Sequence, residues 1–350
     1  MAYTDIDKSD DYFNTKLYTG TGATQSITGV GFQPDWTWIK CRSNAHNHQS
    51  FDILRGATKQ LFPNLTNVEQ TGATSLTSFD SDGFSLGNAT GVNGSGQTHV
   101  AWNWLASNTT ASNTDGSITS TVSANTTSGF SIVSYTGNGI ANATVGHGLG
   151  STPSFIIIKC RNGAFGWYCY HKGIDATAPE DYFIRSDTTG ARVNSPAVLN
   201  DTAPGTSVFT LGTSLSSNGS GYTYIAYCFA DKKGFSKFGK YTGNGNADGT
   251  YVYTGFKPAY VVVKRSDSTG EWYCWDNKRS INNVQDKMIV LSQAYTEYSG
   301  SSWNYIDFLS NGFKIRNTDA TINGSGGTFI YMAFAENPFT TSTGIAGTAR

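Results

Sequence analysis

The chain has 350 residues, and its 24 lysines and arginines balance 25 aspartates and glutamates to a net charge of −1. Charged residues make up 14% of the chain, against about 25% in an average globular protein, so the sequence lacks the clustered positive charge that nucleic-acid binding requires. Aromatic residues make up 13%, which argues against disorder, and no apolar run approaches the roughly 18 residues of a membrane span.

The first segment of the chain, residues 1–12, is acidic and has no apolar stretch. It therefore does not resemble a signal peptide, and we expect the chain to fold in a cytoplasm. We interpret this segment as a short N-terminal docking segment.

Three later segments share the same motifs in the same order. Each begins with Tyr-Thr-Gly-x-Gly, at residues 18–22, 135–139 and 241–245. Each continues to an apolar stretch that ends in a lysine (Lys40, Lys159 and Lys264) and closes with Asn-Gly-Ser-Gly and a second apolar stretch. A fixed order of motifs indicates a repeated structural unit.

The repeats divide the chain into predicted domains. The expected bounds are a docking segment over 1–12, repeats over 13–107, 130–232 and 237–339, a Ser/Thr/Asn-rich linker over 108–129 and a polar tail over 340–350. Within the linker, a short strand over residues 118–122 is an option. Only four residues, 233–236, separate the second repeat from the third, so we expect these two repeats to pack closely.

The closing stretch of each repeat alternates in the manner of a β-strand. In the first repeat, Val100, Trp102 and Trp104 fall on one face, because residues two apart in a strand point the same way. The stretches that end in lysine are continuously apolar, as in strands buried on both faces. With 40 glycines, several Asn-Gly turn signals and little helical pattern, the sequence predicts an all-β protein of three tandem β-sandwiches, jelly-roll or lectin-like, of about 100 residues each.

Cysteines and histidines give no metal-site signal. The five cysteines are odd in number and form no Cys-x-x-Cys pair, so we expect free, buried thiols, with one disulfide as the alternative. His46 and His48 are two residues apart and have no counterpart in the other repeats, which favours a loop or interface role. The sequence predicts no catalytic residue, no cofactor and no metal.

Two acid–base pairs occupy equivalent places in the first and third repeats. Asp52 and Arg55 match Asp276 and Arg279, whereas the second repeat has His171 at the aspartate position. A catalytic pair would not be spread over two copies and missing from the third. A local salt bridge or turn lock is the better interpretation, and its energy would be modest if it were exposed.

Aromatic residues cluster at matching positions of the second and third repeats. These residues are Trp167, Tyr168, Tyr170, Trp272, Tyr273 and Trp275. Tryptophan and tyrosine favour protein interfaces and stack on flat ligands such as sugars, so at least one set is a candidate surface for a glycan or a partner. The competing interpretation is a core strand with alternating sides.

Several stretches resemble virion proteins of marine tailed bacteriophages, which carry tandem copies of a domain of uncharacterised function and are described as structural or tail-fibre-like. The resemblance lies in residues 1–4, 12–20, 27–36, 129–139, 225–230 and 331–339. It implies a non-enzymatic protein of the virion, assembled in the host cytoplasm. It carries over no catalytic or binding residue.

The leading hypothesis is a tail-fibre or receptor-binding component that contacts a host cell-surface glycan or protein. Its partners would be other virion proteins and further copies of itself, for example in a trimer, but not nucleic acid or a membrane. A capsid decoration protein that bridges capsomers is the alternative. A glycan depolymerase fits less well, because no pair of carboxylates across a cleft can be identified.

Overall fold

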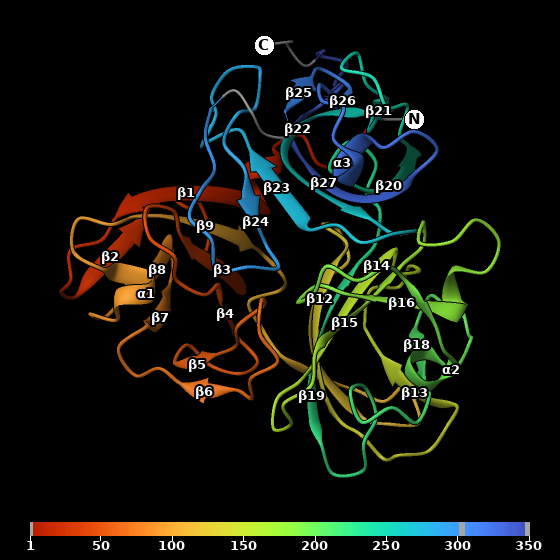
Figure 1. Cartoon of the computed structure of the whole chain (residues 1–350). Coiled ribbons are helices and arrows are strands. Elements are labelled where there is room, and N and C mark those ends of the chain that lie inside the picture. The colour runs from red at the N-terminus through yellow and green to blue at the C-terminus, as the bar shows by residue number, and fades with distance from the viewer. Residues whose placement is uncertain (1–2, 301–304, 347–350) are drawn as a thin grey trace.

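The structure, a computed structural model, describes residues 3–300 and 305–346. It is all-β, as predicted, and its strands form antiparallel sheets. The three repeats form three lobes around a common centre (Figure 1). In these described residues the longest helices have four residues, so no helix could span a membrane.

Each lobe contains a large sheet with the same order of four strands. In the first lobe these are β1 (Phe13–Thr19), β9 (Thr98–Trp104), β3 (Trp36–Cys41) and β4 (Gln49–Asp52). In the second they are β12 (Phe130–Thr136), β19 (Thr223–Phe229), β14 (Phe155–Cys160) and β15 (Trp167–His171). In the third they are β20 (Ser236–Thr242), β27 (Thr328–Pro338), β22 (Phe256–Arg265) and β23 (Trp272–Asp276).

A smaller sheet packs on the outer face of each large sheet. These small sheets contain β2 (Gln25–Thr28), β8 (Gly83–Leu86) and β7 (Leu76–Asp80); β13 (Ala143–Gly146) and β18 (Val208–Leu211); and β21 (Tyr251–Tyr253), β26 (Gly312–Ile315) and β25 (Ile306–Leu309). A separate apolar cluster joins the two layers in each lobe. The lobes are therefore two-layered, and a jelly-roll or lectin-like strand order stays a prediction.

The remaining elements are short. They are β5 (Lys59–Gln60), β6 (Gln70–Thr71), β16 (Tyr182–Arg185), β17 (Val193–Asn194) and β24 (Ile289–Val290), the α-helices α1 (Thr90–Asn93), α2 (Pro196–Leu199) and α3 (Ala320–Asn323), and the 3₁₀ turns η1 (Ser9–Asp11) and η2 (Pro179–Asp181). They form loops and sheet extensions around the lobes.

The stretch expected to be a linker, residues 108–129, is part of the second sheet. It contains β10 (Ala111–Asn113) and β11 (Ser120–Asn125), and β11 pairs with β12 along its whole length. Its many serines and threonines suit strands as well as linkers, since threonine favours β-structure. The short strand considered over residues 118–122 corresponds to β11, whereas the polar composition gave no sign of β10.

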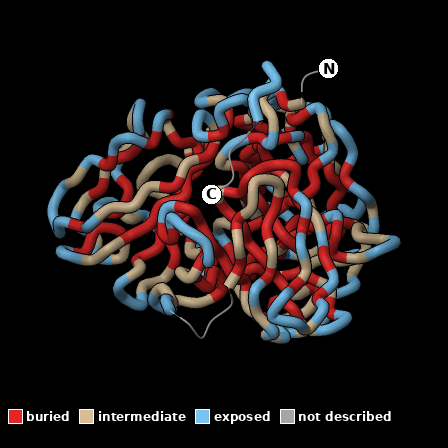
Figure 2. Tube along the Cα trace, turned by 90° about the horizontal axis from the view of Figure 1, so that it is seen from above, coloured by how far each residue is buried: buried red, intermediate tan, exposed pale blue. Residues whose placement is uncertain are grey.

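The inner faces of the three large sheets share one core. Trp104, Phe229 and Phe334 occupy equivalent positions, and each is only 1% exposed. Their ring centroids lie 5.9, 6.0 and 6.5 Å apart, so the three rings form a triangle at the centre of the molecule. Figure 2 shows buried chain throughout the interior and exposed chain at the outer loops. The inward assignment of these rings is confirmed, but the core they enter belongs to all three lobes.

The repeated glycine and asparagine motifs form a loop latch in every lobe. Asn93, Asn218 and Asn323 are fully buried, and the side-chain oxygen of each accepts a backbone N–H from the Tyr-Thr-Gly-x-Gly loop at 2.9–3.1 Å. Each side-chain amide donates to one backbone carbonyl just after that loop and to another carbonyl six residues before the asparagine itself. The motifs are therefore accounted for by structure.

The predicted docking segment lies against the third lobe of its own chain. The Tyr3 hydroxyl donates to the Gly255 carbonyl at 2.6 Å, and the Thr4 hydroxyl donates to the Lys233 carbonyl at 2.8 Å. Residues 1–2 of this segment and residues 347–350 of the predicted tail lie outside the described residues. The described part is thus occupied by an intramolecular contact.

Candidate functional site

The aromatic clusters predicted as a candidate surface are almost entirely inside the molecule. Five of the six side chains are at most 8% exposed, and Tyr168 is half-buried. The residues concerned are Trp167, Tyr168, Tyr170, Trp272, Tyr273 and Trp275. The expectation of a solvent-facing set is therefore wrong for five of them, because both faces of β15 and β23 are covered: one by the shared core and one by the lobe's own outer layer.

Two of these tryptophans bind the neighbouring lobe. The indole N–H of Trp167 donates to the Phe62 carbonyl of the first lobe at 3.0 Å, and that of Trp272 donates to the Arg185 carbonyl of the second at 2.9 Å. His48 stands at the matching place in the first lobe, and its Nε2 lies 3.0 Å from the Val290 carbonyl of the third. Each lobe thus contacts the next in a closed cycle.

His48 is consequently an interface residue, as the sequence analysis favoured. Its Nδ1 accepts the indole N–H of Trp38 at 2.9 Å, which leaves Nε2 as the protonated nitrogen that donates to the third lobe. Burial lowers the pKa of His48 well below its usual range. The ring is a neutral link between lobes and is not placed to bind a metal.

The three repeated lysines also link neighbouring lobes. Lys40, Lys159 and Lys264 are fully buried. Their ammonium groups lie 3.4, 3.0 and 3.1 Å from the carbonyls of Ala294, Thr66 and Thr189, respectively, in the adjoining lobe. Burial lowers the pKa of each ammonium group to about 8.

The Asp–Arg pairs form buried ion-pair chains between lobes. The Asp52 and Arg55 side chains are fully buried, and Arg55 continues to Glu69, which also pairs with Arg161 of the second lobe at 2.9 Å. Asp52 further accepts the hydroxyl of Tyr227 at 2.7 Å. The local salt bridge is confirmed, but it is buried, and Glu69 connects it to Arg161 of the second lobe.

The third lobe repeats this chain towards the first. Arg279 pairs with Asp276 at 2.6 Å and with Glu297 at 3.2 Å, and Glu297 pairs with Arg42 at 2.8 Å. The bridging glutamates, Glu69 and Glu297, were missed by sequence reasoning because they lie in loops without a repeated motif. Breaking such a buried pair from one side is costly, so these residues hold the lobes together.

The thiols and three further histidines, His99, His147 and His171, are also buried, whereas His46 is half-buried. All five cysteines are free and buried, as expected. Among the residues that the structure describes, no three His, Cys, Asp or Glu side chains form a group that could hold a metal ion. The repeated polar residues therefore join the lobes and close their loops. A functional surface has to be sought among other residues.

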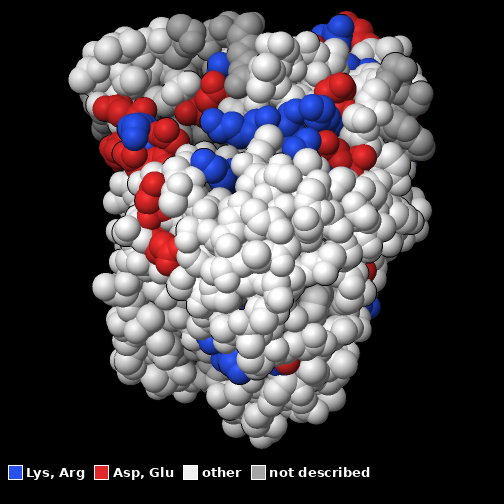
Figure 3. All heavy atoms as spheres, turned by 90° about the vertical axis from the view of Figure 1, so that its left-hand side faces the viewer, with Lys and Arg blue, Asp and Glu red and all other residues white. Residues whose placement is uncertain are grey.

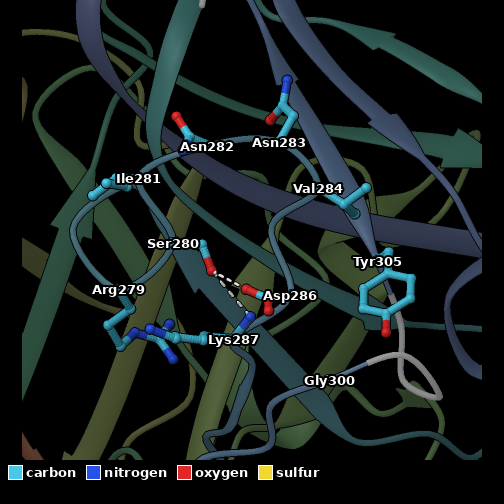
Figure 4. Close-up of a pocket in the computed structure, with 10 residues that line it drawn as sticks. All are labelled: Arg279, Ser280, Ile281, Asn282, Asn283, Val284, Asp286, Lys287, Gly300 and Tyr305. Carbon is cyan, nitrogen blue, oxygen red and sulfur yellow. Dashed lines mark hydrogen bonds between the residues drawn. The ribbon is translucent and has the colours of Figure 1, made fainter.

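One hollow in the third lobe has a volume of about 610 Å³. Figure 4 shows its loop of polar residues, with Asn282 and Asn283 at the rim and Ser280, Asp286 and Lys287 below them. The Ser280 hydroxyl donates to Asp286 at 2.7 Å and accepts the Lys287 backbone N–H at 3.1 Å. The Ser280 hydroxyl and the Asp286 carboxylate are therefore already engaged within this loop.

A second hollow on the third lobe, of about 410 Å³, combines tyrosine rings with lysines. We call it the tyrosine–lysine surface, and it comprises Tyr3, Tyr253, Lys232, Lys233 and Lys237. Tyr253 is 51% exposed, and the Lys237 ammonium lies 5.1 Å from its ring centroid. The Lys233 ammonium lies 4.6 Å from the ring of Tyr3. Such cation–π contacts orient the rings.

This surface was not singled out from the sequence. Residues 233–236 were interpreted only as a link, and Tyr3 lies far from the other members in sequence. The one available signal was the alternation in β21, where Tyr251 and Tyr253 point outwards and Val252 is buried. A single tyrosine pair is a weak signal without the fold that brings the lysines beside it.

Comparison with known proteins gives a family without an assigned activity. Residues 8–338 match the family described as a domain of unknown function, DUF7483. This chain belongs to that family. The matched range includes all three lobes, in agreement with their shared core. No curated protein and no solved structure matches the chain.

Proposed function

We propose that this DUF7483 protein is a non-enzymatic structural component of a bacteriophage virion, of the tail-fibre or receptor-binding kind. The observation that carries the proposal is the use of the repeated polar residues. Asparagines close loops, lysines and histidine join lobes, and Asp–Arg pairs lie buried between lobes. We infer that a protein built in this way acts through its surface. The sequence resemblance to virion proteins of tailed bacteriophages supports a place on a phage particle.

The outer surface suits a particle component that must not bind charged polymers indiscriminately. Figure 3 shows a face on which most atoms belong to uncharged residues, with most of the charged side chains in the upper part of the view and a smaller group in the lower part. The chain as a whole has a net charge of −1. Low net charge limits non-specific attraction to nucleic acid and membranes, so the proposed partners are other virion proteins and the host cell surface.

Contacts with further copies of the chain are part of the proposal, but their number is open. Within one chain, the three lobes already bury their inner faces against one another. Three separate sandwiches would have needed the same faces to form a trimer. A homo-oligomer would therefore form through the outer surfaces. We place the mature protein on the virion, after assembly in the host cytoplasm.

A capsid decoration protein is the second candidate, and the cyclic contacts favour it specifically. Three similar lobes around a centre fit a position where three capsomers meet. Hundreds of copies per virion would indicate the capsid, whereas tens or fewer would indicate the tail. Quantitative mass spectrometry of purified virions measures this number directly.

A glycan depolymerase is the least favoured candidate. Two neighbouring acids in the first lobe, Asp80 and Asp82, have structural partners: Asp80 accepts the Ser78 and Ser85 hydroxyls, and Asp82 accepts the backbone N–H groups of Gly29 and Gly31. Cleavage of a host polysaccharide by the purified chain would revive this candidate.

The test of the main proposal is a gene deletion combined with virion analysis. We expect the chain in purified virions and a loss of adsorption to host cells on deletion. Absence from virions, or normal adsorption of the deletion phage, would contradict the receptor-binding role. Normal adsorption together with less stable capsids would instead indicate a capsid decoration protein.

A further inference from the structure

The tyrosine–lysine surface has an excess of positive charge within an otherwise charge-poor chain. Its hollow is lined by three lysines and one acid, Asp231. Asp231 is already paired with Lys172, which lies outside the hollow, and it also accepts the backbone N–H of Phe238 at 2.9 Å. The positive charge of Lys232, Lys233 and Lys237 is therefore not neutralised within the hollow.

The rings of this surface are held in place before any ligand arrives. The Tyr3 hydroxyl is fixed on the Gly255 carbonyl at 2.6 Å and lies 3.4 Å from the hydroxyl of Tyr253. Lys237 donates to the Tyr253 carbonyl at 2.9 Å while its ammonium group remains near the ring. Preorganised groups lose less conformational entropy on binding, so the surface is suited to recognition.

Apolar area extends beyond the hollow. Tyr251, on the same strand as Tyr253, is 43% exposed, and Phe339, whose ring centroid lies 6.2 Å from that of Tyr3, is 38% exposed. Large exposed apolar side chains that gather on one surface mark interaction sites more often than isolated ones do. Rings flanked by lysines match a ligand that has flat apolar faces and negative charges.

We propose that the tyrosine–lysine surface binds an anionic polysaccharide, with sugar rings stacked on Tyr253 and carboxylate or sulfate groups paired with the lysines. This inference rests on the proposed host-surface role and names the class of ligand. The hollow of about 410 Å³ falls within the range of roughly 300–1,000 Å³ that is typical of ligand pockets.

Nucleic acid is a poorer match for the same surface. Duplex-binding proteins commonly neutralise about 6–10 phosphates, and this hollow offers three lysines. The net charge of −1 adds no attraction from the rest of the chain. Binding to nucleic acid is accordingly an outcome that the experiment must separate from binding to a sugar polymer.

The experiment compares a neutral polymer and its sulfated form with a second anionic polysaccharide and with nucleic acid. The full chain is titrated by calorimetry with dextran sulfate, with neutral dextran, with alginate as a polyuronate, and with a DNA duplex. We expect binding to the two anionic polysaccharides, weakening as salt rises, and at least tenfold weaker binding to dextran and to DNA.

Variants locate the binding on the surface. Tyr253→Ala and the double variant Lys233→Gln/Lys237→Gln should each weaken binding at least tenfold. Tyr295→Ala and Lys59→Gln/Lys278→Gln are matched controls, since Tyr295 is 46% exposed and these lysines lie elsewhere on the surface. All four variants should keep the thermal stability of the parent chain, because the replaced side chains are not in the core.

Three results would overturn the inference: equal affinity for dextran and dextran sulfate, tightest binding to DNA, or equal effects of the test and control variants. An absence of binding to all four polymers would also overturn it. Phage carrying Lys233→Gln/Lys237→Gln separates this failure from that of the proposed function. Normal adsorption of this variant, with adsorption lost on gene deletion, would refute the polysaccharide site and leave the virion role standing.

Discussion

Replacing Phe334 by alanine should destabilise all three lobes together. The Phe334 ring is 1% exposed and lies about equally close to Trp104 of the first lobe and Phe229 of the second, with centroids 5.9 and 6.0 Å away. An aromatic side chain buries about 150–250 Å², which at about 25 cal/mol per Å² corresponds to roughly 4–6 kcal/mol. Since alanine retains part of this area, we expect a loss of about 3–5 kcal/mol in the free energy of unfolding.

The buried thiols allow each lobe to be followed separately. Cys41, Cys169 and Cys274 lie in the first, second and third lobes, and all are fully buried. Pulsed alkylation along a urea titration, read by mass spectrometry, gives one unfolding midpoint for each cysteine. We expect three coincident midpoints that move together to lower urea in the Phe334→Ala variant.

The control for this experiment is Val193→Ala, at a side chain that is 48% exposed. Such surface substitutions change stability by about 0.5 kcal/mol or less. A Phe334→Ala variant in which only Cys274 becomes reactive at lower urea would refute the shared core. The lobes would then unfold independently, as three separate sandwiches would.

Three further predictions concern the buried polar groups. Arg279→Ala should lower the free energy of unfolding, measured by chemical denaturation, by about 3–5 kcal/mol, because it leaves buried carboxylates unpaired. The control Arg192→Ala, at a partly exposed ion pair, should lower it by about 1 kcal/mol or less. Asn218→Ala should cost about 2–4 kcal/mol, since it opens a buried loop latch and leaves backbone groups unpaired; an unchanged melting temperature would contradict this role. Acidification from pH 7 to 5 should cost about 2 kcal/mol for each of His48 and His171. Burial lowers both pKa values, that of His171 to about 3, so only the unfolded chain gains the proton. Substituting both by glutamine should reduce the pH dependence of the urea midpoint, of which the buried His99 and His147 keep a part, and an unchanged slope would refute the assignment.

Period-two alternation in the sequence correctly located the strands that enter the core. Trp102 and Trp104 point inwards because adjacent residues of a strand face opposite sides, and the residues of β14 and β22 that precede each buried lysine are central, as their apolar runs indicated. These features depend on local pattern alone. They could therefore be predicted without knowledge of how the repeats assemble.

The arrangement of the lobes could not be predicted in this way. The pattern that marks Trp167 and Trp272 as strand residues is the same whether their outer neighbour is water or another lobe, so the sequence left the core and surface interpretations open, and the structure confirms the core one. Glu69 joins Arg55 to Arg161 only because a loop of one lobe reaches the next. The tyrosine–lysine surface likewise depends on Tyr3 folding back onto the third lobe, which no local pattern encodes.

Differential scanning calorimetry of the full chain tests most directly whether the three repeats form one body around a shared core. At about 0.7 kcal/mol per residue near 60 °C, 350 residues give a calorimetric enthalpy of roughly 245 kcal/mol, against roughly 70 kcal/mol for a lobe of about 100 residues. A shared core predicts a single peak whose van't Hoff enthalpy equals the calorimetric one. A van't Hoff enthalpy near one third of the calorimetric value, or three resolved peaks, would contradict it.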